Sequence, residues 1–191
     1  MAAPDRPAPS LESLSDLGRS EGLRRARLLP PTLRAIALGE ALPWLDGADR
    51  QRAAAWLIRR AERGEGLDGV AAAISRAGSL VFGGRSAPAG QEAVFQLTRR
   101  WHAVPEPMRD RALHAAGAAR WVRAIDRAIL DDDPRSRASA AELAGLVGAR
   151  LGSRSALERV SPMLADEDRG VARAAERALV RATGRAAELE T

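Results

Sequence analysis

The chain has 191 residues, with a hydrophobic fraction of 46% and an aromatic fraction of 3%, so a core built mainly from Ala, Leu, Val and Ile is expected in a chain long enough for one domain. All 30 basic residues are Arg, the net charge is +5, and the sequence contains neither Cys nor Lys. The lack of Cys excludes disulfides, thiolate zinc sites and cysteine nucleophiles, and the lack of Lys excludes a P-loop lysine and a lysine Schiff base.

The N-terminal residues and the apolar stretches predict where the protein works. The opening M-A-A-P-D-R-P-A-P-S has no basic start followed by an apolar run. No apolar stretch approaches the roughly 20 residues that a membrane span needs. We therefore expect a cytoplasmic protein without a membrane partner. The richness in Arg and Ala resembles that of proteins from GC-rich bacterial genomes.

Nearly the whole chain after a Pro- and Ala-rich tail at residues 1–9 has the pattern of helices, and no segment alternates long enough for a strand. Ser10 is a suitable cap for a short helix that carries Leu11, Leu14 and Leu17. Proline and glycine set most later boundaries, because proline fits the first helical turn and glycine fits the residue after the last. The later helices are expected over residues 32–42, 46–63 or 49–63, 68–82, 88–102, 108–116, 120–130, 134–147, 155–164 and 169–183.

Two stretches of the chain carry related sequences at an offset of 34 residues. Residues 130–144 read LDDDPRSRASAAELA, and residues 164–178 read LADEDRGVARAAERA. The Leu, Asp and Glu matches are informative because they are rarer here than Ala, and a period of this length is typical of stacked helical pairs. In the first copy, Asp133 fits a helix N-cap before Pro134, which favours a helix boundary over a cation site in the acidic turn.

The order of an apolar helix, an acidic turn and a helix that opens with R-A-x-A resembles HEAT repeats of the short bacterial kind, most strongly over residues 120–184. The resemblance implies an all-α, right-handed α-solenoid of antiparallel helix pairs, with about nine or ten helices. It would form one domain over residues 10–185, followed by a C-terminal tail at 186–191. In HEAT repeats, an Asp in the turn and an Arg six residues later join neighbouring repeats. This spacing occurs in Asp131 with Arg137, in Asp46 with Arg52 and, more loosely, in Glu167 with Arg173.

The residues that would suggest catalysis or a bound cofactor have structural explanations. The glycines of Gly64–Gly69 match G-x-G-x-x-G, but they follow a helix rather than a strand, so a C-cap at Gly64 and an N-cap at Asp68 explain them. His102 and His114 lie in no metal-ligand frame, and His114 is expected in a hydrogen-bonded packing role. No G-x-S-x-G motif occurs. We expect no catalytic residue, cofactor or metal.

One candidate binding site is a basic face on the helix at residues 46–63. Residues 18–63 hold ten Arg and five acidic residues, so the whole net charge lies in this segment. Arginine around an aromatic residue suits nucleic acid, because guanidinium groups bind phosphates and an indole stacks on a base. The alternative is that Trp56 packs under the next helix and that the arginines are only solvated. The face consists of Arg52, Trp56, Arg59, Arg60 and Arg63.

A second basic row follows the last predicted helix at every fourth residue. Like charges at this spacing repel by a few tenths of a kcal/mol per pair. A terminal helix with one solvent-exposed face tolerates such a repulsion. The alternatives are a surface that binds an acidic protein or a phosphate backbone, or the start of a longer repeat array. The row consists of Arg169, Arg173, Arg177 and Arg181, with Arg185 beyond it.

Together these features predict a non-enzymatic helical-repeat scaffold that binds another protein. Nucleic-acid binding through the arginine and tryptophan face is the first alternative, and a role as an accessory subunit of an enzyme complex is the second. The missing catalytic motifs and the repeated helix pair both favour the scaffold.

Overall fold

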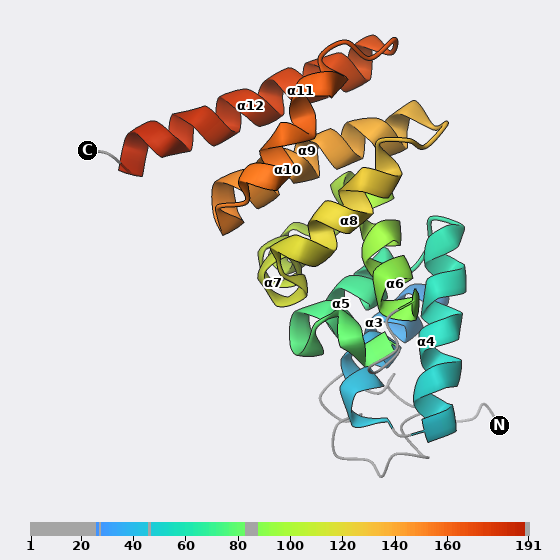
Figure 1. Cartoon of the computed structure of the whole chain (residues 1–191). Coiled ribbons are helices and arrows are strands. Elements are labelled where there is room, and N and C mark those ends of the chain that lie inside the picture. Colours follow the sequence, from blue (N-terminus) through green and yellow to red (C-terminus); the bar gives the residue numbers. More distant parts are fainter. Residues whose placement is uncertain (1–25, 27, 46, 83–87, 190–191) are drawn as a thin grey trace, which may run out of the picture.

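The computed structural model describes residues 26, 28–45, 47–82 and 88–189. Within these ranges the ordered elements are all helices and no strand occurs (Figure 1), which confirms the predicted all-α class. The short helix predicted after Ser10 lies outside the described residues.

Most helices begin and end near the predicted proline and glycine boundaries. In chain order the elements are α3 (Pro31–Ala41), the 3-10 helix η1 (Leu42–Trp44), α4 (Gly47–Glu62), α5 (Leu67–Ala77), η2 (Ser79–Phe82), α6 (Pro88–Arg99), η3 (Trp101–Ala103), α7 (Glu106–Ala116), α8 (Ala118–Ala128), α9 (Pro134–Leu151), α10 (Arg154–Glu158), α11 (Val160–Met163) and α12 (Arg169–Leu189). Asp133 caps α9 as predicted, since its carboxylate accepts a hydrogen bond of 3.0 Å from the Arg135 amide.

The start of α5 differs from the prediction. Its N-cap is Gly66, which has a left-handed φ of +65°, and not Asp68. The Asp68 carboxylate lies one residue inside the helix and accepts a hydrogen bond of 2.9 Å from the Gly69 amide. A left-handed residue at this position favours glycine, so the conformation of the turn and not a capping side chain determines where α5 begins.

Three predicted helices are divided, and two continue past their predicted ends. The segment predicted over 88–102 consists of α6 and η3, and α9 continues to Leu151, past its predicted end at residue 147. The segment predicted over 68–82 ends as an α-helix before Gly78, and its remainder is η2. The segment predicted over 155–164 consists of α10 and α11, which meet at Arg159. Helix α12 continues to Leu189, past its predicted end at Thr183 and into the segment assigned to a C-terminal tail.

The helices stack in two columns between which the chain alternates. In one column α3 packs on α5 and α5 packs on α7, and in the other α4 packs on α6 and α6 packs on α8. Farther along the chain, α9 packs on α8, α6 and α12. Helix α12 lies at the end of the molecule opposite to α3 and α4 (Figure 1). Helices α4 and α12 therefore belong to opposite ends of the stack.

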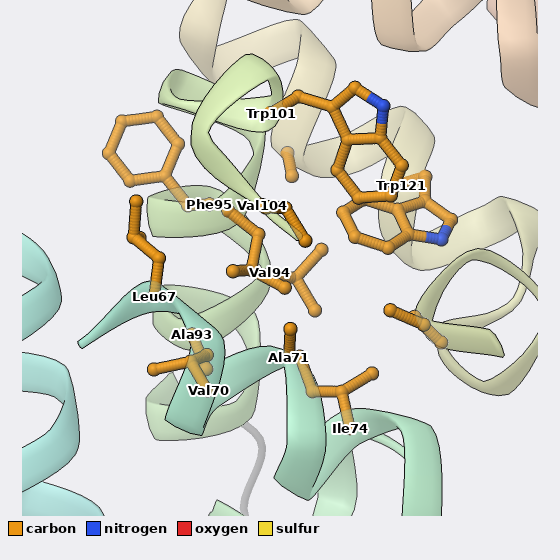
Figure 2. Close-up of a cluster of buried hydrophobic side chains, with 14 of the residues drawn as sticks. Leu67, Val70, Ala71, Ile74, Ala93, Val94, Phe95, Trp101, Val104 and Trp121 are labelled. Carbon is orange, nitrogen blue, oxygen red and sulfur yellow. The ribbon is translucent and has the colours of Figure 1, made fainter. Parts of the chain in front are cut away.

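The core contains mostly small aliphatic side chains, as the composition predicted, and it includes two buried tryptophans (Figure 2). The rings of Trp101 and Trp121 pack edge to face with centroids 5.3 Å apart. The Trp121 indole N–H donates a hydrogen bond of 2.8 Å to the Leu113 carbonyl oxygen. Such an aromatic pair stabilises the fold by about 1 kcal/mol beyond the contribution of its buried area. The pair joins the segment after α6 to α8.

Glycine brings neighbouring helices of the stack into close contact at two crossings. Where α3 crosses α5, a Cβ on Gly39 would overlap the Gly69 backbone, and a Cβ on Gly69 would overlap the Ala35 carbonyl group. Where α9 crosses α12, a Cβ on Gly145 would lie 2.7 Å from the Ala178 Cβ. Because small residues let helices approach closely, both crossings depend on hydrogen or methyl side chains.

Candidate functional site

The acidic turns of the repeated sequence are joined by one arginine. The guanidinium group of Arg137 donates two hydrogen bonds of 2.9 Å to the Asp166 carboxylate. It donates a further bond of 3.0 Å to the Asp131 carbonyl oxygen and one of 3.3 Å to that of Asp132. The Arg137 side chain is 12% exposed and that of Asp166 is 13% exposed. Arg137 thus binds its own turn and the turn that follows α11 at the same time.

The ionisation of these groups follows from their contacts. The hydrogen bonds from Arg137 hold the pKa of Asp166 below its usual value, although partial burial opposes the shift. The same hydrogen bonds raise the pKa of Arg137. Burial raises the pKa of Asp131, but hydrogen bonds from the Asp133 amide and the Ser136 hydroxyl, with the charge of Arg99, lower it overall. All of these groups are charged at neutral pH.

The Asp and Arg residues that the HEAT resemblance pairs make contacts other than the expected ones. Arg137 meets Asp131 through the Asp131 backbone, whereas the Asp131 carboxylate lies 2.7 Å from Arg99 Nε. Asp46 lies outside the described residues, and Arg52 instead contacts Asp49 at 2.5 Å. The structure places Glu167 beside Arg137, with 3.7 Å between Glu167 Oε1 and Arg137 Nη2. The Asp166 carboxylate and the Asp131 carbonyl oxygen therefore join the two turns through Arg137, whereas the Asp131 carboxylate links its own turn to Arg99 at the end of α6.

The histidines and acidic residues form no metal site in the part of the chain that the structure describes, where no group of three ligand-type side chains comes together. His102 and His114 are both exposed. The packing role predicted for His114 is wrong, because α7 buries the neighbouring Ala112 and Leu113 on its other side. The His114 ring makes a contact of 2.9 Å from Nδ1 to the Asp110 carbonyl oxygen.

The basic face on α4 contains residues with different surroundings. Arg59 and Arg63 are exposed, whereas Trp56 is half-buried and packs against the core. The Arg60 guanidinium carbon lies 5.1 Å from the centre of the Trp56 ring, and Arg60 Nη2 lies 2.5 Å from Glu65 Oε2. Arg60 therefore supports the indole and is only 21% exposed itself.

A groove of about 730 Å³ opens between α3 and α4. Arg34 in this groove was not among the predicted site residues, since no pattern within the α3 sequence indicates which neighbour that helix faces. The Arg34 side chain donates hydrogen bonds to the carbonyl oxygens of Ala26, at 3.1 Å, and Leu29, at 3.2 Å. The polar lining is Arg34, Asp49, Gln51, Arg52 and Arg59, beside Leu38, Trp56 and several alanines. The groove thus combines positive charge with an aromatic side chain.

The predicted basic row on α12 lies on the exposed side of that helix. Arg169, Arg173, Arg177 and Arg181 are all exposed. The opposite side of α12 is buried and includes Val171 and four alanines. Arg177 contacts Glu142 of α9, with 3.2 Å between Arg177 Nη2 and Glu142 Oε1. The structure therefore separates the two predicted basic sites and puts them on opposite ends of the stack.

No family model, curated protein or solved structure matches this chain. In addition, none of the helices within the described ranges is both long and apolar enough to cross a membrane. The likeness to HEAT repeats accordingly rests on the sequence pattern, and the two basic surfaces are the candidate functional sites.

Proposed function

We propose that this protein is a non-catalytic scaffold of the α-solenoid kind that binds an acidic protein through the outer side of α12. The observation that carries the proposal is the exposed row of arginines on that helix. Its buried side packs on α9, so the row lies on the exposed side of the helix, where only Arg177 among the described contacts reaches back to Glu142 of α9. A helix in this position has one face available for a partner.

The solenoid part of the proposal draws on the order of the helix contacts. The chain alternates between two columns, and neighbouring hairpins pack side by side. Arg137 links one acidic turn to the next, which is the kind of contact that HEAT repeats use between neighbours. In repeat proteins each unit contacts mainly its neighbours, and the surface that results commonly binds other proteins.

The choice of an acidic partner follows from the spacing and chemistry of the row. At 1.5 Å per residue, arginines four residues apart are about 6 Å apart along the axis. Val180 is 71% exposed between Arg177 and Arg181, and it adds an apolar contact to the charged surface. The planar guanidinium group binds a carboxylate through two hydrogen bonds, which favours acidic side chains. A partner would also relieve the repulsion along the row.

Charge reversal on α12 tests the proposal. The immobilised chain is expected to retain one or a few specific proteins from a cell extract, as identified by mass spectrometry. The double variant Arg173→Glu with Arg181→Glu should reduce their capture by about tenfold or more, equivalent to about 1.4 kcal/mol.

The matched control is Arg111→Glu with Arg135→Glu, which changes the charge equally at exposed positions on α7 and α9. It should leave capture unchanged. Equal capture by the wild type and the α12 variant, or equal loss in both variants, would contradict a binding surface on α12.

A further inference from the structure

We propose that the groove between α3 and α4 binds single-stranded nucleic acid, with Trp56 against a base and Arg52 and Arg59 against the flanking phosphates. Helices α3 and α4, whose residues line the groove, lie at the other end of the stack from α12 (Figure 1), so this site is separate from the protein-binding surface proposed above. The proposal does not depend on that surface.

The first argument is the placement of the three side chains on α4. At 100° per residue, Arg52, Trp56 and Arg59 fall within a sector of about 60°. The two arginines are seven residues apart, which is about 10 Å along the helix axis. All three side chains line the groove. A cation therefore lies on each side of the indole along one line, as a base with its two neighbouring phosphates requires.

The second argument is how the indole is held. Trp56 is half-buried against the core, and the Arg60 guanidinium group lies 5.1 Å from the ring centre. Glu65 in turn fixes Arg60 through a 2.5 Å contact. A ring held by the core and by an anchored cation loses little freedom when a base stacks on it. Trp56 thus has the properties of a preformed stacking surface.

The third argument is the charge of the groove. Three arginines and one aspartate contribute to its lining, so the lining is positive. Asp49 contacts Nη2 of Arg52. A guanidinium group has five N–H donors, so Arg52 keeps donors for a phosphate. Arg34 adds positive charge from α3 while it bonds to backbone carbonyl groups. The positive charge favours a phosphate backbone.

Two features favour a single strand over a duplex and over an acidic peptide. The indole is half-buried at the groove, where only an unpaired base presents a free face for stacking. The carboxylate side chains of an acidic peptide pair with arginine, but they have no flat apolar face that could pack on Trp56 and the neighbouring Leu38. Bases and phosphates together match both kinds of side chain in the groove.

Fluorescence anisotropy with a labelled oligothymidylate of about 15 nucleotides tests the proposal. At about 50 mM salt, the variant Arg52→Gln with Arg59→Gln should raise the Kd by about tenfold or more. Its plot of log K against log salt should be less steep by about 1.4, because each lost phosphate contact removes about 0.7. The matched control Arg173→Gln with Arg181→Gln removes the same charge from α12 and should keep both values.

A separate measurement tests the stacking role of Trp56. Trp44 is 67% exposed, so Trp44→Phe removes its emission, while Trp101 and Trp121 are buried. In this variant the oligonucleotide should quench part of the remaining tryptophan emission. The added substitution Trp56→Leu should remove that quenching and weaken binding. Thermal unfolding of every variant shows whether it remains folded.

Several outcomes would overturn the proposal. The first is no binding of the oligonucleotide at about 50 mM salt, and the second is tighter binding of a duplex of the same length. The third is binding that the α12 double variant weakens as much as the α4 double variant does, or that the α12 double variant alone weakens. The fourth is an absence of quenching in the Trp44→Phe variant. Protein capture through α12 is measured in a separate experiment with other variants, so this proposal can fail while the one above stands.

Discussion

The crossing of α3 with α5 and the crossing of α9 with α12 both bring helix backbones close together, but charged groups contribute differently to them. At the first crossing, the only ion pair between the two helices among the described residues is Arg76 with Glu40, at 3.8 Å and with both side chains more than a third exposed. At the second, Arg177 of α12 lies 3.2 Å from Glu142 of α9, and near the N-terminal ends of the two helices Arg137 and Asp166 form a two-bond pair with both side chains nearly buried. The first crossing therefore relies on shape, and the second on shape and charge together.

The largest effect is expected from a methyl group at the α3–α5 crossing. Gly69→Ala should lower the free energy of unfolding by about 3 kcal/mol, because the new Cβ would overlap the Ala35 backbone and approach Leu57. The control is Gly184→Ala on α12, where a Cβ meets open space. In the control, the free energy of unfolding should rise by about 1 kcal/mol, because alanine has a higher helix propensity than glycine. Urea unfolding curves measure both, and similar midpoints for the two variants would contradict the close contact.

A smaller effect is expected when the charged link beside α12 is removed. Arg137→Ala should lower the free energy of unfolding by about 2 kcal/mol, because it removes two charge-assisted hydrogen bonds and leaves Asp166 without them. Arg76→Ala, its counterpart at the α3–α5 crossing, should cost less than about 0.5 kcal/mol because that pair is exposed. Equal costs in urea unfolding would remove the contrast between the two crossings.

The smallest effect is expected from acid. The folded pKa of Asp166 is lowered, so its contribution to stability is present above the unfolded pKa of about 3.9 and is lost as the pH falls through the folded pKa. The stability gap between the wild type and Asp166→Asn should therefore shrink between pH 6 and about pH 2. Urea midpoints along a pH series measure the gap. A constant gap would show that the charge of Asp166 contributes nothing.

Local features of the fold were predictable from sequence, and distant contacts were not. The cap at Asp133 and the helix start at Pro134 depend on neighbouring residues, so the pattern identified them. The partner of Arg137 was missed because Asp166 lies 29 residues away, and the 34-residue offset aligns Arg137 with Val171. Such pairs depend on how helices stack, and a single helix pattern carries no information about that.

The candidate sites show the same division. The exposed row on α12 follows from the period of one helix, so its members were identified together. On α4, the helical period grouped Arg60 with the binding residues, whereas its contact with Glu65 depends on the turn that follows the helix. Arg34 was absent from the prediction because the groove forms only when α3 lies beside α4.

The close contact of Gly39 with Gly69 has a mechanical consequence. Because no side chain separates the two backbones there, α3 and α5 meet over a short stretch centred on Gly69, which lies against both Ala35 and Gly39. Rotation about that stretch changes few atomic distances, whereas sliding pushes main-chain atoms of one helix into the other. At the other end of the stack, the two parallel bonds between Arg137 and Asp166 also resist rotation, because a twist bends both of them. A pulling or bending force on this protein should therefore turn α3 against α5 before it turns α9 against α12.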